Sequence, residues 1–246
     1  MKQARIIMGM PITVDIVGED SQEVFNKVFD YFDKVDARFS TYKRNSEISQ
    51  VNHGEIKPEE YSDELKEILY LAKQTKYETE GYFDIQQDER IDPSGIVKGW
   101  AINNAAKILK DDGFKNFYIE AGGDIEASGA PEGQQYWRTG IRNPFKPKEI
   151  VKVLKVSNLG VATSGTYERG KHIYNPVTHS YAIEISSLTV IGPNIFDADR
   201  FATGAFAMGK NGINFIEKLE DFEGYMIDNN GIATMTSGFE KYVLND

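Results

Sequence analysis

Two short turn sequences, each lying between strand-like runs, constrain the fold of this chain more than any other feature. Gly122-Gly123-Asp124 separates a predicted strand at residues 116–121 from another at 125–128, the pattern of a β-hairpin. Asn229-Asn230-Gly231 separates the runs 222–227 and 231–236 in the same way. Because hairpins and helices are mixed without a regular alternation, the sequence favours an α+β architecture over a doubly wound sheet.

The remaining periodicity predicts helices and strands along the whole chain. Apolar stripes predict helices that start near Ser21, run from Ser62 to Glu78, cover residues 97–110, include Asp199 and cover 212–219. Further strands are expected at residues 6–17 (broken at 9–11), 137–142, 151–156, 160–163 and 186–191. No repeat, low-complexity linker or composition break divides the chain, so residues 1–246 are expected to form a single domain.

Composition excludes several classes of function. The formal net charge of -10 argues against a nucleic-acid surface, which needs a basic face. It does not exclude an anionic small molecule, because one metal ion and one lysine invert the local field. The chain has no cysteine, which excludes disulfides, zinc–thiolate sites and cysteine nucleophiles.

The N-terminal residues carry no recognisable targeting signal. The apolar run before Gly9 is too short for a signal-peptide core, and no cysteine is present for lipidation. No stretch approaches the roughly 20 apolar residues of a membrane helix. The expected protein therefore has no membrane span and is cytoplasmic.

A carboxylate and a hydroxyl one helical turn apart form the clearest candidate metal site. Asp199 and Thr203 share one helix face and offer two hard oxygen ligands. Mg²⁺ takes few protein ligands and completes its shell with water and substrate phosphates. Asp197, by contrast, fits equally well as an acidic residue of the first helical turn that is favoured by the helix dipole.

Glycine-rich and hydroxyl-rich segments that precede Asp199 in the chain suit a phosphate-bearing ligand. In residues 92–101, Lys98 is expected in the first turn of a helix, whose amides attract anions; a solvated lysine in a tight loop is as good an interpretation. Gly122 and Gly123 allow close backbone approach to a ligand, although they also suit a plain hairpin turn. Thr163 and Ser164 follow a strand and offer hydroxyls to phosphate oxygens, unless they form an ordinary polar loop. His172 fits either a general base or a structural role.

These segments, in this order, resemble the ApbE-type family of FAD:protein FMN transferases over nearly the whole chain. The similar blocks are Met8-Gly9-Met10-Pro11, Phe39-Ser40-Thr41-Tyr42, Asn45-Ser46-Glu47-Ile48 with Asn52, Gly81-Tyr82-Phe83-Asp84, Gly95-Ile96-Val97-Lys98-Gly99, Ala121-Gly122-Gly123-Asp124, Ala162-Thr163-Ser164-Gly165, His172-Ile173 and Ala198-Asp199 with Ala202-Thr203.

The resemblance implies a T-fold-like α+β domain that binds FAD and Mg²⁺. Its activity would move FMN from FAD onto a threonine or serine hydroxyl of an acceptor flavoprotein subunit, with release of AMP. Asp199, Thr203 and the Gly95 carbonyl would ligate Mg²⁺, and Asp199, His172 and Lys98 would be catalytic. The implied FAD-binding residues are Met10, Asn52, Asp84, Lys98, Gly122, Gly123, Asp124, Thr163, Ser164 and His172.

The chain departs from the family pattern at three places: Asn175 replaces the usual aspartate, His179 a common glycine, and Arg200 the usual alanine. Arg200 could contact a phosphate or the partner, or point to solvent. None of the three removes a proposed magnesium side chain. Two other functions stay open: an Mg²⁺-dependent FAD pyrophosphatase that forms FMN and AMP, and a non-catalytic FAD-binding module.

Overall fold

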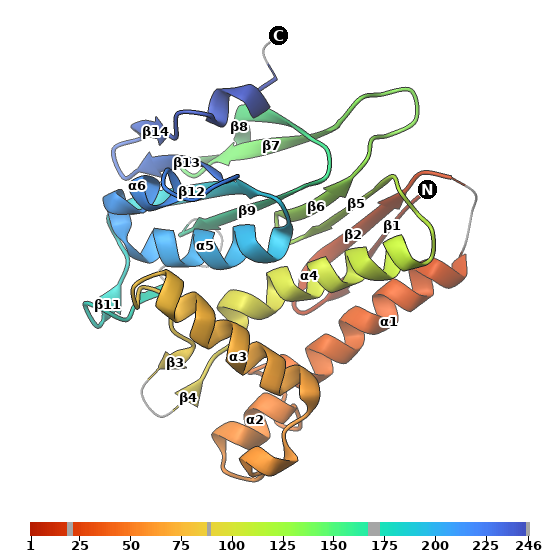
Figure 1. The fold of residues 1–246 in the computed structure, drawn as a ribbon, viewed down its shortest axis with the longest axis vertical. Coiled ribbons are helices and arrows are strands. Elements are labelled where there is room, and N and C mark those ends of the chain that lie inside the picture. Colours follow the sequence, from red (N-terminus) through yellow and green to blue (C-terminus); the bar gives the residue numbers. More distant parts are fainter. Residues whose placement is uncertain (19–21, 88–89, 167–172, 245–246) are drawn as a thin grey trace.

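A computed structural model describes residues 1–18, 22–87, 90–166 and 173–244, and its centre is one antiparallel eight-stranded sheet (Figure 1). The strands in spatial order are β1 (Lys2–Ile7), β2 (Met10–Ile16), β5 (Phe117–Ala121), β6 (Asp124–Ser128), β9 (Leu159–Gly165), β12 (Ile185–Gly192), β13 (Glu223–Asp228) and β14 (Ala233–Met235). This confirms the α+β prediction.

The remaining strands form three separate two-stranded pairs. They are β3 (Gln86–Gln87) with β4 (Arg90–Ile91), β7 (Trp137–Asn143) with β8 (Lys146–Val156), and β10 (Tyr174–Asn175) with β11 (Ser180–Tyr181). The helices are α1 (Gln22–Phe39), α2 (Glu47–Asn52), α3 (Asp63–Glu78), α4 (Ser94–Asp111), α5 (Ile195–Ala207) and α6 (Gly212–Ile216).

Two-residue turns with positive φ close the β1–β2 and β5–β6 hairpins of the large sheet. Gly122 and Gly123 have φ of 57° and 90°, which glycine adopts without strain and which matches the twist of the flanking strands. Met8 and Gly9 make the same kind of turn, with φ of 55° and 73°. The prediction of one broken strand over residues 6–17 was therefore wrong: Ile7 pairs with Met10 across a reversal of the chain.

Helix boundaries depend on local hydrogen bonds. The predicted Ser62 cap is confirmed, since its Oγ accepts a hydrogen bond from the Leu65 amide at 3.1 Å. Helix α4 starts earlier than predicted because the Asp92 carboxylate accepts a hydrogen bond from the Ser94 amide, so Lys98 lies beyond the first turn. Helix α6 ends before the predicted Leu219, whose amide bonds to Ile216 three residues back and tightens the turn.

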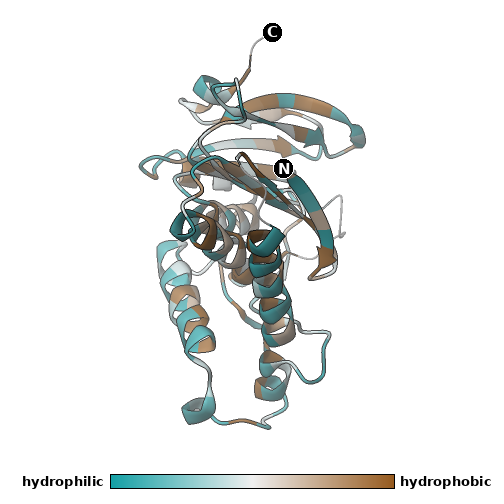
Figure 2. Cartoon of the chain, turned by 90° about the vertical axis from the view of Figure 1, so that its right-hand side faces the viewer, coloured by the Kyte–Doolittle hydropathy of each residue, from teal (hydrophilic) through white to brown (hydrophobic). Residues whose placement is uncertain are grey.

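Two hydrophobic cores lie on opposite faces of the sheet. The larger core joins the sheet to α1, α3, α4 and α5, and the smaller one joins β6, β9, β12 and β13 to the β7–β8 hairpin. Figure 2 shows hydrophobic residues concentrated along the sheet and hydrophilic residues along the outer helices. No helix among the described residues is both long and apolar enough to cross a bilayer.

The start of α5 is anchored on the sheet by a buried carboxylate. Glu126, only 2% exposed, accepts a hydrogen bond from the Ile195 amide at 2.8 Å. A Cβ built at Gly160 would lie 2.2 Å from the Ile195 nitrogen, so the helix end touches bare strand backbone. Burial raises the pKa of Glu126, while the Ile195 amide and Lys110 act in the opposite direction.

Glu126→Ala should lower the free energy of unfolding by about 2 kcal/mol, because it leaves the Ile195 amide buried without an acceptor. The matched control Glu126→Gln keeps an acceptor and should cost less than about 1 kcal/mol. Since the folded state binds the Glu126 proton more tightly than the unfolded chain, the wild type should lose stability relative to Glu126→Gln as the pH rises above about 4.5. Urea unfolding at pH 4.5 and 7.5 measures both effects, and equal costs for the two variants would contradict them.

Candidate functional site

A cavity of about 730 Å³ opens where the turns of the sheet meet the helices. Its wall includes the β1–β2 and β5–β6 turns, the end of β9, the segment after α1, the start of α4 and one face of α5. This volume lies in the upper part of the range of pockets that hold a whole small molecule, roughly 300–1,000 Å³. The cavity gathers segments that are far apart in the sequence.

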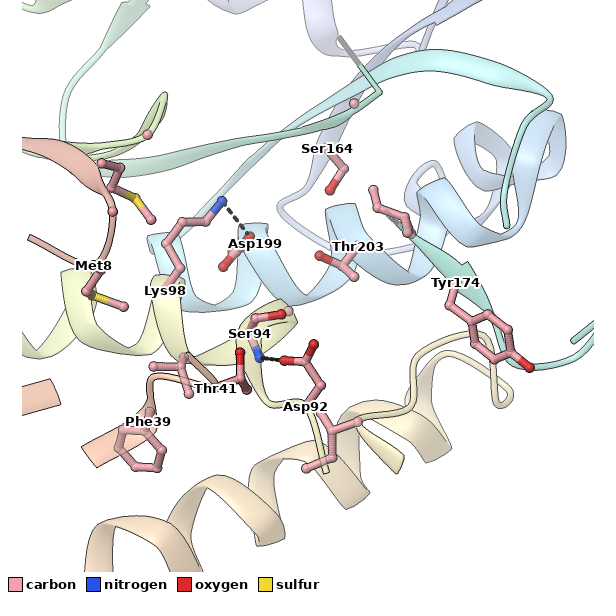
Figure 3. Close-up of a pocket in the computed structure, with 18 of the residues that line it drawn as sticks. Met8, Phe39, Thr41, Asp92, Ser94, Lys98, Ser164, Tyr174, Asp199 and Thr203 are labelled. Carbon is pink, nitrogen blue, oxygen red and sulfur yellow. Dashed lines mark hydrogen bonds and ion pairs between the residues drawn. The ribbon is translucent and has the colours of Figure 1, made fainter. Parts of the chain in front are cut away.

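One lysine and one buried carboxylate line this cavity, and a second buried carboxylate lies directly behind the lysine. Lys98 on α4 lies 2.5 Å from Asp124 Oδ2 and 3.7 Å from Asp199 Oδ1. Figure 3 shows Lys98, Asp199 and Thr203 pointing into the same space from two adjacent helices. Asp124 is fully buried behind Lys98, and its Oδ1 accepts a hydrogen bond from the Thr163 amide at 3.0 Å. Asp124 therefore holds both Lys98 and the β9 backbone in place.

With both carboxylates ionised, the cluster carries an excess of negative charge in a poorly solvated place. Burial raises the pKa of Asp199 to about 7; Lys98 opposes this shift and the neighbouring Asp124 adds to it. One ammonium group cannot neutralise two carboxylates. A bound cation beside Asp199 would supply the missing positive charge.

Oxygen atoms suited to such a cation lie around Asp199. Thr203 follows Asp199 by one turn of α5, and both side chains line the cavity. A Cβ built at Gly95 would lie 3.4 Å from Thr203 Cγ2, so the Gly95 backbone lies close to Thr203. The Gly99 amide, which an α-helix normally directs at the Gly95 carbonyl, donates to Asp199 Oδ2 at 2.8 Å. One carboxylate, one hydroxyl and one carbonyl form the donor set that Mg²⁺ prefers.

This donor set is poor in charged ligands. No group of three or more His, Cys, Asp or Glu residues suited to a metal ion occurs in the described part of the chain. A cation held by Asp199, Thr203 and Gly95 would therefore keep open positions for water or substrate oxygens.

Most of the residues predicted from sequence meet at the cavity. Its lining includes Met10, Asp84, Gly95, Lys98, Gly122, Gly123, Thr163, Ser164, Asp199 and Thr203. Met10 lies under the turn, since a Cβ built at Gly122 would be 2.9 Å from its sulfur. Asp84 is paired with Lys76 at 2.5 Å, and the Thr163 hydroxyl lies 2.9 Å from that of Thr189.

Two predicted residues are placed elsewhere, and a third is not described. Asn52 does not line the cavity; both ends of its side-chain amide bond to the Ile91 backbone, at 2.8 and 2.9 Å. Asp124 lies behind the wall rather than in it. His172 lies outside the described residues.

Arg200 forms ion pairs with carboxylates on α5 and α3. Its guanidinium bonds to Asp197 at 2.7 Å and to Glu78, and its Cζ lies 4.0 Å from the Phe201 ring centroid. The side chain is 12% exposed. Arg200 therefore joins α5 to α3, is mostly buried and is not among the residues that line the cavity.

Several lining residues were missed from sequence. Tyr174 and Tyr181 come from the short β10–β11 hairpin, and Gly140 and Arg142 come from β7. No periodicity marks two-residue strands, so the two tyrosines gave no signal. Asp92 and Ser94 lie in the selected segment 92–101 but were not singled out; an aspartate whose carboxylate accepts from the amide two residues on is typical of a turn.

A model of the ApbE family matches residues 8–89 and 86–226, which together span most of the chain. The chain belongs to the ApbE family. Among curated relatives, the FAD:protein FMN transferase of Haemophilus influenzae is 26% identical and covers 84% of this chain and 80% of its own length. That of Salmonella typhimurium is 22% identical over 97% of this chain and 88% of its own.

Solved ApbE structures share the fold. The flavin transferase ApbE of Vibrio cholerae superposes with a TM-score of 0.85 at 21% identity, over 98% of both chains. The ApbE protein of Thermotoga maritima gives 0.86 at 20% identity, over 100% of this chain and 99% of that one. The ApbE architecture thus accounts for the whole sheet and its helices.

Proposed function

We propose that this chain is an FAD:protein FMN transferase, a single domain over residues 1–246, which moves FMN from FAD onto a threonine or serine of an acceptor protein. One observation carries the proposal: in an ApbE-family chain, Lys98, Asp199 and Thr203 converge in a cavity of about 730 Å³. The names of the relatives from Haemophilus influenzae and Salmonella typhimurium support the same activity.

The residues present fit a magnesium ion. Asp199, Thr203 and the Gly95 carbonyl would hold it, and the excess negative charge of the Asp124–Asp199 pair favours a divalent cation there. When bound, Mg²⁺ neutralises charge on the FAD diphosphate. The Asp199 carboxylate would have to be ionised, which the cation itself promotes.

The residues of the chain bind and orient the diphosphate. Lys98, which is 21% exposed at the wall, supplies a positive charge fixed by Asp124. The Gly122–Gly123 turn lets the ligand approach the backbone closely. Ser164, on strand β9, offers a hydroxyl to the same cavity. Because these groups are already held in place, they stabilise charge on the reacting phosphate without rearranging.

The proposed reaction is a substitution at the FMN phosphorus of FAD. The acceptor hydroxyl oxygen forms a bond to the FMN phosphorus, the bond between that phosphorus and the bridging oxygen breaks, and AMP leaves with that oxygen. The hydroxyl proton passes to a base. His172 is the residue that the sequence suggests for this role, and it stays a prediction.

Incubation of the purified chain with FAD, Mg²⁺ and a candidate acceptor flavoprotein subunit tests the proposal. We expect the acceptor mass to increase by FMN less water, with one AMP released per FMN transferred, and no transfer in EDTA. Peptide sequencing should locate the FMN on a threonine or serine. AMP release at the same rate without acceptor would identify a pyrophosphatase, and FAD that binds without being cleaved would identify a binding module.

A further inference from the structure

The β7–β8 hairpin has the opposite charge to the rest of the molecule. Residues 137–156 contain six basic side chains and one acidic side chain, in a chain of formal net charge -10. The basic residues are Arg138, Arg142, Lys146, Lys148, Lys152 and Lys155. A local excess of this kind gives the hairpin a positive field that attracts an anionic partner.

The outer face of this hairpin combines cations with exposed apolar side chains. Trp137, Ile141 and Leu154 point inward to the smaller core, so the alternate residues point outward. Arg138 lies directly opposite Lys155 in the strand pairing, an arrangement of like charges that costs stability. Such a cost suggests that the pair serves binding rather than folding.

Apolar surface lies beside these charges. Ile150 is 50% exposed and Val153 is 37% exposed, and Val153 is paired with Gly140 across the hairpin. A Cβ built at Gly140 would lie 2.9 Å from Ile150 Cδ1, so Ile150 lies across the bare backbone of β7. Apolar centres rimmed by charge are typical of protein–protein contacts.

The same face leads into the cavity. Gly140 and Arg142 belong to the cavity lining, and Arg138 precedes Gly140 by two residues on the outer side, about 7 Å along the strand. A partner that covers the hairpin therefore also covers the mouth of the cavity. An acceptor protein must come to this mouth if its hydroxyl is to reach the diphosphate.

We propose that the outer face of the β7–β8 hairpin, formed by Arg138, Gly140, Ile150, Val153 and Lys155, is the docking surface for the acceptor protein. The acceptor presents acidic side chains around its accepting hydroxyl. This inference rests on the proposed function. A second copy of this chain is a poorer occupant, because it would close the cavity to any protein substrate.

The test compares two charge-reversed variants with the wild type, using the acceptor flavinylated in the transfer assay. Arg138→Glu with Lys155→Glu reverses the docking surface and changes no residue of the cavity lining. Lys66→Glu with Lys73→Glu makes the same change of net charge on α3, which contributes no residue to that lining. Initial rates are measured against acceptor concentration and, separately, against FAD concentration.

We expect the hairpin variant to raise the KM for the acceptor at least ~10-fold at low salt, with kcat and the KM for FAD within ~2-fold of wild type. The α3 variant should keep all three constants within ~2-fold. Raising the ionic strength from about 0.05 to 0.3 M should raise the wild-type KM for the acceptor and flatten the difference. This salt series needs no variant, so a salt-independent KM still overturns the proposal if the hairpin variant fails to fold.

An unchanged KM for the acceptor in the folded hairpin variant, or a salt-independent KM in the wild type, overturns the proposal. Binding of the wild type to phosphatidylglycerol vesicles, lost in the variant while the acceptor KM is unchanged, would assign the face to a membrane. A dimer in sedimentation that only the variant dissociates would assign it to a second copy. Absence of any FMN transfer by the wild type would refute the proposed function itself.

Discussion

Asp199→Asn should lower the rate of FMN transfer by ~10³-fold or more while the protein stays folded. The substitution keeps the shape of the side chain and an acceptor for the Gly99 amide, but it removes the charged ligand from the donor set. Burial already raises the pKa of Asp199 to about 7, so a neutral isostere should not destabilise the protein without metal. The stabilisation that Mg²⁺ confers on thermal unfolding should disappear with the activity.

Asp197→Asn is the matched control for this variant. Asp197 lies two residues earlier on the same helix, where it bonds to Asn194 and Arg200 and does not line the cavity. Its substitution should leave transfer within ~3-fold of wild type and keep the Mg²⁺ effect. Metal-dependent transfer at the wild-type rate in Asp199→Asn would refute the ligand assignment.

Gly99→Ala should have the second largest effect, because the two helices touch at this residue. An added Cβ would lie 2.7 Å from Asp199 Cβ, 2.9 Å from its Oδ2 and 3.0 Å from the Ile195 carbonyl oxygen. The Ile195 oxygen belongs to the backbone, and Asp199 Cβ cannot move without its own backbone, so α4 and α5 must separate. We expect a loss of about 3 kcal/mol in the free energy of unfolding and a ~10²-fold loss of transfer as Asp199 shifts.

Gly95→Ala provides the comparison for Gly99→Ala on the same helix. There the added Cβ meets only the edge of the Phe83 ring at 3.3 Å and Thr203 Cγ2 at 3.4 Å, and both side chains can give way. Its effect on stability should stay within about 1 kcal/mol, and transfer should persist because the proposed ligand is a backbone carbonyl. Chemical unfolding and transfer rates measure both variants, and equal losses in the two would contradict this account.

The sequence predicted those parts of the site that depend on local geometry. The spacing of Asp199 and Thr203 follows from the helical repeat, and the structure places both side chains at the cavity. The Gly122–Gly123 turn follows from the conformational freedom of glycine. The residues that the family resemblance added, such as Met10 and Asp84, also reach the cavity wall.

The sequence could not predict contacts between residues that lie far apart in the chain. Asn52 looked like a ligand-binding residue, but its amide pairs with the backbone of Ile91, which is 39 residues away. Arg200 looked free to meet a phosphate, yet it bonds to Glu78 on another helix. A polar side chain looks the same in a sequence whether it binds a ligand or another part of the chain.

Local sequence alone determined that this chain is an α+β protein with hairpins, and that α5 carries a carboxylate and a hydroxyl on one face, because turns and helices are set by short-range sterics and hydrogen bonds. Only the tertiary structure decided that Lys98 is shared by Asp124 and Asp199, and that a cationic hairpin borders the cavity. These features come from packing two helices and a second strand layer on opposite faces of one sheet, and the spacing of residues along the chain carries no record of that packing.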